Sequence, residues 1–255
     1  MPSPLRTRLS QARGRIARVL ALAIIAFLLL TALPVLLMRW VDPWTSAFMV
    51  AARADAILDG QWRTTNRYEW RNLAEISPQA GLAVIASEDQ LFPFHAGFDL
   101  ESIRDAMQDN ARSKRVRGAS TITQQVAKNL FLWKGRSWLR KGLEAWFTVL
   151  IEAMWPKQRI LEVYLNVAEF GPHVYGAEAA ARQYFGRPAS RLSRPQAALL
   201  AAVLPNPRRF SVAAPSRYVR RRADWIQTQM RALGGPKYLE QLENPTAPPR
   251  RSARR

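Results

Sequence analysis

Residues 118–129 read GASTITQQVAKN, and they show two distinct faces at helical spacing. Ser120 is suited to an N-cap, because its hydroxyl can accept a hydrogen bond from a backbone N–H of the first turn. An apolar face recurs at helical spacing in Ile122, Val126 and Leu130. A polar face at positions i, i+3, i+4 and i+7 is formed by Thr121, Gln124, Gln125 and Lys128. The pattern therefore predicts a helix over residues 120–132.

The polar face combines a hydroxyl, two amides and an ammonium group, and it contains no acid. Such a set can bind the hydroxyls of a sugar together with a phosphate. The alternative is an ordinary solvated helix face, although such faces usually mix Glu with Lys. The spacing leaves both interpretations open.

Immediately downstream, residues 130–144 (LFLWKGRSWLRKGLE) alternate aromatic and basic side chains. This pattern is typical of a membrane interface, where rings lie at headgroup depth and cations contact phosphates. Arg136, Arg140 and Lys141 are suited to a pyrophosphate, which arginine binds through its bidentate fork. The segment is therefore a candidate pyrophosphate-binding site.

Glu144 enters a nearly all-apolar helical stretch, residues 145–151. A carboxylate in that setting is expected to be buried and must be paired. Its local partners at helical spacing are Arg140 (i−4) and Lys141 (i−3). The competing interpretation is an ion pair with a purely structural role.

Upstream, residues 87–97 read SEDQLFPFHAG. Glu88 follows an apolar segment, residues 82–86, and precedes a loop that contains two Phe and a Pro. Partial desolvation there would raise the pKa of its carboxyl toward the operating pH of a general base. The alternative is that Glu88 or Asp89 caps a helix. His95 is interpreted as a structural histidine that holds the loop.

The N-terminal stretch 19–38, VLALAIIAFLLLTALPVLLM, contains no charged residue. At about 1.5 Å per residue, a helix of this length crosses a hydrocarbon core of about 30 Å. A cleaved signal peptide would have a shorter apolar region, of about 7–15 residues, closed by a small-residue cleavage site. We therefore expect one transmembrane signal-anchor. Five arginines precede it without an acid among them, which predicts a cytoplasmic N-terminus and places the rest of the chain on the other side of the membrane.

Behind the anchor, apolar periodicity near 3.6 recurs and no run of alternating strands is visible, so the predicted fold class is mostly α. Ser193 with Pro195 predicts a helix start, and residues 234–236 (GGP) predict a stop. Helices are expected over residues 99–108, 120–132, 138–154, 158–166, 175–185, 195–204 and 217–233. The expected organisation is a basic cytoplasmic N-terminus (1–18), the anchor (19–38), one globular domain (45–240) and a disordered basic tail (244–255).

The net charge of +19, from 38 basic and 19 acidic residues, indicates an anionic partner. Nucleic acid, an acidic membrane surface and a phosphate-bearing substrate all fit, but the expected topology turns the body away from the genome and disfavours nucleic acid. The chain has no Cys and only two His. Disulfides, thiolate nucleophiles and Cys-ligated zinc are thereby excluded, and a His-based metal site is disfavoured.

Five motifs occur in order: E-D-x-x-F-x-x-H-x-G from Glu88, G-x-S-T-x-T-Q-Q-x-x-K-N from Gly118, R-K-x-x-E from Arg140, K-x-x-I-L-E-x-Y-L-N from Lys157, and GAEAAARQYFG from Gly176. Over about residues 70–215 the chain resembles the peptidoglycan glycosyltransferase domain, glycosyltransferase family 51, which also occurs in class A penicillin-binding proteins. Its length and single anchor resemble the monofunctional members. No S-x-x-K or K-T-G motif is present, which argues against a transpeptidase.

The resemblance implies a mostly α, lysozyme-like glycosyltransferase domain with one N-terminal transmembrane helix. It implies polymerisation of lipid II into glycan strands in cell wall biosynthesis, by inverting transfer that releases undecaprenyl diphosphate. The implied location is the bacterial inner membrane, with the catalytic domain in the periplasm. The implied partners are lipid II, the growing glycan strand, the membrane and other cell-wall synthesis or division proteins, but no nucleic acid.

The resemblance also implies residue roles. Glu88 would be the catalytic base, and Glu144 the second catalytic carboxylate, which organises the pyrophosphate region. The negative charge of the diphosphate would be stabilised by Lys128, Arg136 and Arg140. The remaining substrate-binding residues would be Ser120, Thr121, Gln124, Gln125 and Asn129. No tightly bound cofactor is implied, although a divalent cation (Mg²⁺ or Mn²⁺) is expected to support activity.

One position departs from the family pattern. Six residues after Asp99 the family often has a basic residue, whereas this chain has Asp105 with Arg104 beside it. Two other functions compete with the polymerase: a membrane-anchored lytic transglycosylase or lysozyme-like hydrolase with Glu88 as general acid, and a non-enzymatic basic membrane protein. The cation cluster argues against the hydrolase, because cleavage of a neutral glycan needs no diphosphate site.

Overall fold

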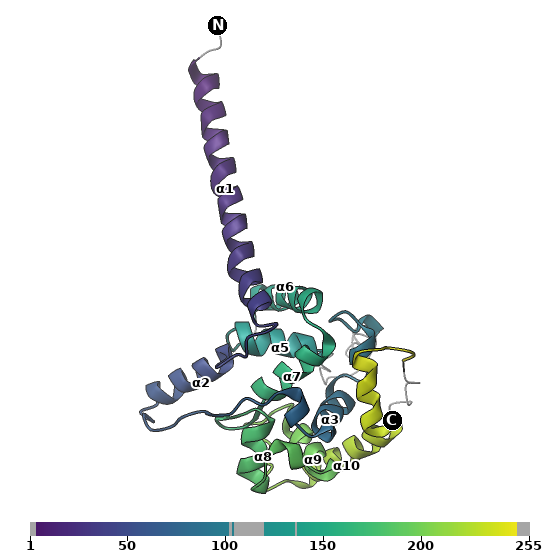
Figure 1. The fold of residues 1–255 in the computed structure, drawn as a ribbon. Coiled ribbons are helices and arrows are strands. Elements are labelled where there is room, and N and C mark those ends of the chain that lie inside the picture. Colours follow the sequence, from purple (N-terminus) through teal and green to yellow (C-terminus); the bar gives the residue numbers. More distant parts are fainter. Residues whose placement is uncertain (1–3, 102–103, 105–119, 136, 249–255) are drawn as a thin grey trace. The chain divides into compact units, whose positions relative to one another are not determined.

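The computed structural model describes residues 4–101, 104, 120–135 and 137–248, with side chains from residue 14 onward (Figure 1). The chain divides into two compact units, residues 1–41 and 42–255. The predicted basic residue Arg136 and the departure at Asp105 lie outside the described residues. Most of the predicted helix 99–108 does as well, although Leu100, Glu101 and Arg104 are helical.

The first unit is dominated by one helix, α1 (Pro4–Leu37), which contains Pro34. Its segment Gly14–Leu37 is long enough and apolar enough to cross a membrane, with a mean hydropathy of 2.9 over its most apolar 18 residues. Pro is tolerated in such a helix because neighbouring polar groups and local adjustments satisfy the freed backbone. The helix could therefore serve as a membrane anchor.

The second unit is mostly helical, as the sequence predicts. Its α-helices are α2 (Ala47–Leu58), α3 (Pro78–Glu88), α5 (Ile122–Phe131), α6 (Trp138–Met154), α7 (Lys157–Val167), α8 (Ala177–Phe185), α9 (Arg194–Val203) and α10 (Arg217–Ala232). The 3₁₀ helices η1 (Leu73–Glu75), η2 (Phe92–Phe94) and η3 (Ala189–Arg191) lie between them, and η4 (Gly235–Leu242) follows α10.

Helix α3 lies at the centre of this unit. It packs against α9, α10, η4 and α7, while α5 packs against α6 and α7 (Figure 1). All residues from Ala80 to Ala86 are buried. Because this middle stretch is buried on every side, it is apolar throughout and shows no 3.6-residue periodicity, so the sequence carries no signal for this helix. The central position fixes where its C-terminal residue, Glu88, emerges.

The structure adds a small sheet that the sequence analysis did not predict. Its strands are β1 (Arg67–Tyr68), β2 (Glu169–Gly171) and β3 (Val174–Tyr175), in the order β1-β3-β2. β1 runs parallel to β3, with Arg67 opposite Val174, and β2 runs antiparallel to β3. Strands of two or three residues are too short to display the alternation on which strand prediction depends.

Helix boundaries depend on local caps. α9 begins after Ser193, which forms a capping box with Gln196, and α10 ends before Gly234, which has a left-handed backbone; both boundaries confirm the sequence predictions. The predicted N-cap Ser120 is wrong. Thr121 is the N-cap of α5 and forms a capping box with Gln124, whereas Ser120 is exposed one position earlier. Thr121 forms the cap because Gln124 lies three residues after it, the position at which a capping box needs a Glu or Gln side chain.

Candidate active site

Glu88 is the last residue of α3. Its side chain is 14% exposed. Gln125 of α5 donates its side-chain amide to Oε2 across 3.1 Å, and Arg222 of α10 donates from Nη2 to Oε1 across 3.3 Å. Both carboxylate oxygens are therefore held by groups from other helices, far away in the sequence.

The electrostatic environment of Glu88 combines opposing effects. Burial raises the pKa of its carboxyl, while the hydrogen bond from Gln125 and the positive charges of Arg222 and Lys128 lower it; the net direction is upward. Burial acts by removing the water that would stabilise the charged form. A carboxylate with a raised pKa can accept a proton more readily than a solvated one at the same pH.

Asp89 follows Glu88 in the sequence, but its contacts are structural. Its side chain is buried, and its carboxylate contacts Nε2 of His95 at 2.9 Å and accepts the backbone N–H of Ile122 at 3.0 Å. Ile122 is the first residue of α5, so Asp89 joins the end of α3 to the start of α5. A negative charge at a helix N-terminus is also favourable to the helix dipole. His95 thus holds the loop, in line with its interpretation as a structural histidine.

The loop that contains His95 is fixed by a second polar cluster. Lys157 donates to the backbone oxygen of His95 at 2.6 Å and to Glu152 at 2.9 Å. Thr123 of α5 also hydrogen-bonds to Glu152. The cluster ties α5, α6 and α7 to the loop that follows Glu88.

The polar residues of α5 are divided between two roles. Thr121 and Gln124 are buried in the capping box, and Thr121 also donates its hydroxyl to the backbone oxygen of Gly97 at 2.7 Å. Gln125 and Lys128 are half-buried, and Asn129 is buried. Contacts with substrate were predicted for all five of these residues and for the exposed Ser120, and they stay predictions.

Lys128 interacts electrostatically with both predicted catalytic carboxylates, Glu88 and Glu144. Burial and the nearby charges of Arg140 and Lys141 lower the pKa of its ammonium group, and the negative charges of Glu144 and Glu88 raise it; the net direction is downward. Its Nζ lies 5.6 Å from the centre of the Phe48 ring. No carboxylate among the described side chains forms an ion pair with Lys128. The ammonium group is therefore available to an anionic ligand.

Glu144 is buried in α6 and paired as the sequence predicts. Its side chain is 4% exposed, and it forms ion pairs with Arg140 at 3.1 Å and with Lys141. Arg140 is itself only 12% exposed, whereas Lys141 is half-exposed. Helical spacing brings all three onto one face, which confirms the local prediction.

Sequence reasoning missed two residues of this site. Arg222 was placed only in the predicted helix 217–233, within a run of three arginines, and Tyr164 was placed only in the motif that begins at Lys157, without a role of its own. Tyr164 is fully buried and donates its hydroxyl to Oε1 of Gln125 at 3.1 Å. Arg222 lies 134 residues from its partner Glu88, so no local spacing could have indicated the contact.

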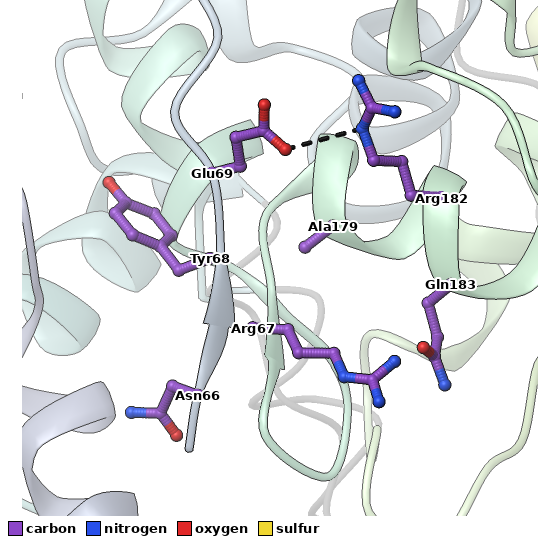
Figure 2. Close-up of a pocket in the computed structure, with 7 residues that line it drawn as sticks. All are labelled: Asn66, Arg67, Tyr68, Glu69, Ala179, Arg182 and Gln183. Atoms are coloured by element: carbon purple, nitrogen blue, oxygen red, sulfur yellow. Dashed lines mark ion pairs between the residues drawn. The ribbon is translucent and has the colours of Figure 1, made fainter.

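A separate pocket of about 420 Å³ lies between β1 and α8 (Figure 2). Its lining is formed by Asn66, Arg67, Tyr68, Glu69, Ala179, Arg182 and Gln183. An ion pair of 3.5 Å joins Glu69 to Arg182 across it. None of the predicted site residues lines this pocket, so it is distinct from the region around Glu88 and Glu144.

The chain is similar to known transglycosylases, both by a family match and by individual relatives. The family Transglycosylase matches residues 56–231, more than half of the chain. A protein of Xanthomonas campestris pv. campestris (strain B100) named biosynthetic peptidoglycan transglycosylase is 55% identical over 230 residues, covering 90% of this chain and 93% of its own length. Proteins of the same name from Stutzerimonas stutzeri (strain A1501) and Pseudomonas entomophila (strain L48) are 56% and 57% identical, over 84% and 82% of this chain and 88% of each relative.

These matches confirm the predicted enzyme class, a glycosyltransferase, and the predicted mostly α, lysozyme-like fold class. The family match and the Xanthomonas campestris relative both span the helices that carry Glu88, Gln125, Glu144 and Arg222. The chain belongs to the transglycosylase family.

Proposed function

We propose that the protein is a peptidoglycan glycosyltransferase that polymerises lipid II into glycan strands in cell wall biosynthesis. The observation that carries the proposal is the arrangement around α5. A partly desolvated carboxylate, Glu88, lies on one side, and an ammonium group without a carboxylate partner among the described residues, Lys128, interacts with it and with the Glu144 cluster. A base and a diphosphate site are the two elements that inverting transfer from a glycosyl diphosphate requires.

In the proposed reaction Glu88 acts as general base. The 4-hydroxyl oxygen of the acceptor disaccharide forms a bond to C1 of the donor sugar, and its proton passes to the Glu88 carboxylate. The bond between C1 and the diphosphate oxygen breaks, with both electrons leaving on undecaprenyl diphosphate. Attack opposite to the leaving group converts the α linkage into a β linkage.

The cations of α5 and α6 would stabilise the leaving group. Lys128 is suited to the developing diphosphate charge because burial strengthens its electrostatic interactions. Arg140 and Lys141 are held by Glu144 in a fixed place beside it, which is the organising role proposed for this carboxylate. Arg136 is proposed for the same role from its motif position alone.

The described residues do not offer a cluster of three or more His, Cys, Asp or Glu side chains that could hold a metal ion. Glu144 is already engaged by two cations. We therefore propose that a supporting Mg²⁺ or Mn²⁺ would enter with the diphosphate of the substrate and not in a site of protein carboxylates.

The proposed location is the bacterial inner membrane, with α1 as a single-pass anchor, the N-terminus in the cytoplasm and the catalytic unit in the periplasm. The apolar segment Gly14–Leu37 and the arginines before and within its start support this orientation. The absence of S-x-x-K and K-T-G motifs from the sequence supports a polymerase without transpeptidase activity. Contacts with other cell-wall synthesis or division proteins stay a prediction.

The proposal is tested by incubating the detergent-solubilised full chain with labelled lipid II, with and without Mg²⁺, and resolving the products by size. A ladder of polymer that muramidase digests is expected. Glu88→Gln should remove nearly all of the polymer, because an amide cannot accept the proton, while Glu240→Gln, at an exposed position, should leave it unchanged. Unchanged lipid II together with solubilisation of purified sacculi would favour the lytic alternative instead.

A further inference from the structure

We propose that Arg222 is a positioning residue that holds Glu88 in its ionised form and directs its carboxylate toward the acceptor hydroxyl. The inference rests on the proposed function, in which Glu88 is the base. Arg222 would act only through Glu88, without contact with the reacting atoms.

Arg222 contacts one carboxylate oxygen of Glu88, and Gln125 contacts the other. Arg222 Nη2 lies 3.3 Å from Oε1, and Gln125 Nε2 lies 3.1 Å from Oε2. Two contacts from separate helices fix both the position and the plane of the carboxylate. Each oxygen retains a further lone pair, so the carboxylate can still accept a proton from substrate.

Helix α10 is itself fixed relative to the end of α3. Arg222 and Gln229 stand two turns apart on one face of α10, and they contact Glu88 and Gln90 respectively. The Gln90 amide donates to Gln229 Oε1 at 3.2 Å. Ala223 and Ile226 between these contacts are buried, and so is Met230 directly after them. Arg222 therefore approaches Glu88 from a rigid support.

The titratable groups that act on Glu88 come from α10, α5 and α7 and from the adjacent Asp89. Arg222 of α10 and Lys128 of α5 favour its ionised form, whereas burial and the neighbouring Asp89 oppose that form. Tyr164 of α7 also interacts with Glu88, but burial raises the pKa of its hydroxyl well above the usual value, so it stays neutral. Among the described residues Arg222 is the cation in ion-pair contact with Glu88. Its removal would leave burial opposed by the hydrogen bond from Gln125 and by the more distant Lys128.

The contact is also weak enough to permit catalysis. Only Nη2 of the guanidinium reaches Glu88, at 3.3 Å, and Nε is buried without a hydrogen-bond partner. A bidentate pair at shorter distance would hold the carboxylate more strongly in its charged form and make it a poorer base. The single long contact keeps Glu88 charged while it remains able to accept the proton.

The test measures the ionisation of Glu88 directly. The full chain is prepared in detergent with ¹³C-labelled glutamate, and the δ-carboxyl resonance that disappears in Glu88→Gln is titrated by NMR. Variants are Arg222→Gln, Arg222→Lys and the matched control Arg221→Gln, which removes the same charge from an exposed neighbour. The pH dependence of kcat/KM for lipid II polymerisation is recorded on the same preparations.

Arg222→Gln is expected to raise the titration midpoint of Glu88 by about one pH unit, and to move the acid limb of kcat/KM upward by the same amount. Arg222→Lys should restore most of the shift, and Arg221→Gln should match the wild type. If Arg222→Gln does not fold, Arg222→Met supplies the neutral substitution with a similar stem. An unchanged midpoint in the neutral variant would overturn the inference.

The two proposals can fail separately. A wild-type chain that does not polymerise lipid II contradicts the proposed function, while the NMR titration still decides whether Arg222 holds the charge of Glu88. A midpoint that moves without the acid limb would show that Glu88 is not the base. Polymerisation by the wild type with an unmoved midpoint in Arg222→Gln would contradict the Arg222 assignment alone.

Discussion

Tyr164 donates its hydroxyl to Oε1 of Gln125 at 3.1 Å. This contact decides which end of the Gln125 amide faces Glu88. Because the oxygen is occupied by Tyr164, the NH₂ group points to the carboxylate, where it donates across 3.1 Å. A fully buried tyrosine thereby sets the orientation of the hydrogen bond that Gln125 donates to the proposed base, although the tyrosine itself makes no hydrogen bond to Glu88.

Tyr164→Phe is expected to lower kcat for lipid II polymerisation about fivefold while leaving KM nearly unchanged. The loss corresponds to about 1 kcal/mol, the contribution of one hydrogen bond, and arises because the Gln125 amide can then rotate. The ring remains in place, so its packing is retained. Steady-state kinetics beside Tyr218→Phe, whose ring is exposed, provide the check. Equal kcat values for the two variants would show that Gln125 needs no such orientation.

Glu144→Gln is expected to destabilise the protein by roughly 2 kcal/mol, because it leaves Arg140 buried with its charge unpaired. The loss should be smaller than the 3–5 kcal/mol typical of a fully buried pair, since Lys141 is half-exposed and can turn to water. Chemical denaturation measures it. The double variant Arg140→Gln with Glu144→Gln should recover part of the lost stability, and no recovery would argue against the pair as the cause.

The same substitution separates structure from catalysis. If Glu144 organises the diphosphate site, turnover should fall more than tenfold, which is a barrier increase above about 1.4 kcal/mol. The assay is run at a temperature where both proteins are fully folded. Turnover within tenfold of the wild type would reduce Glu144 to a structural ion pair.

How much the sequence could predict depends on how local each feature is. α6 begins and ends at the predicted residues, 138 and 154, and the partners of Glu144 lie within one turn of it. The N-cap of α5 was displaced by one residue, from Ser120 to Thr121, because two adjacent hydroxyls compete and only one has an amide three positions later.

Features made by distant segments escaped the sequence analysis. The Arg222–Glu88 pair joins α10 to α3, and the parallel pairing of Arg67 with Val174 joins strands on either side of most of the domain. α3 itself gave no periodic signal because it is buried all round. The motifs predicted Glu88 as the candidate base, which stays a prediction, and the groups that hold its carboxylate became visible only once the helices were placed.

Gly97→Ala is expected to destabilise the protein by about 2–4 kcal/mol. Gly97 has φ of +83°, and an added Cβ would lie 2.6 Å from Thr148 Cγ2 and 2.9 Å from Glu152 Cγ. Both the backbone conformation and the contact with α6 oppose a side chain here. Thermal unfolding is compared with Gly142→Ala, a helical position with open space, where a neutral or slightly stabilising effect is expected. Equal melting temperatures for the two variants would contradict the close approach of this loop to α6.

Glu88→Gln is expected to raise the melting temperature at pH 7–8, and the gain should shrink as the pH falls. Burial raises the pKa of Glu88 in the folded state, so the folded state binds its proton more tightly than the unfolded chain. The stability associated with that proton is present at low pH and is lost as the pH rises through the folded pKa. An uncharged amide avoids the cost of burying a charge above that pH. Melting curves from pH 4 to 8, with Glu240→Gln as the exposed control, measure the difference. A gain that grows toward low pH would mean that Arg222 and Gln125 outweigh burial, and that the proposed base is stabilised in its charged form by the fold.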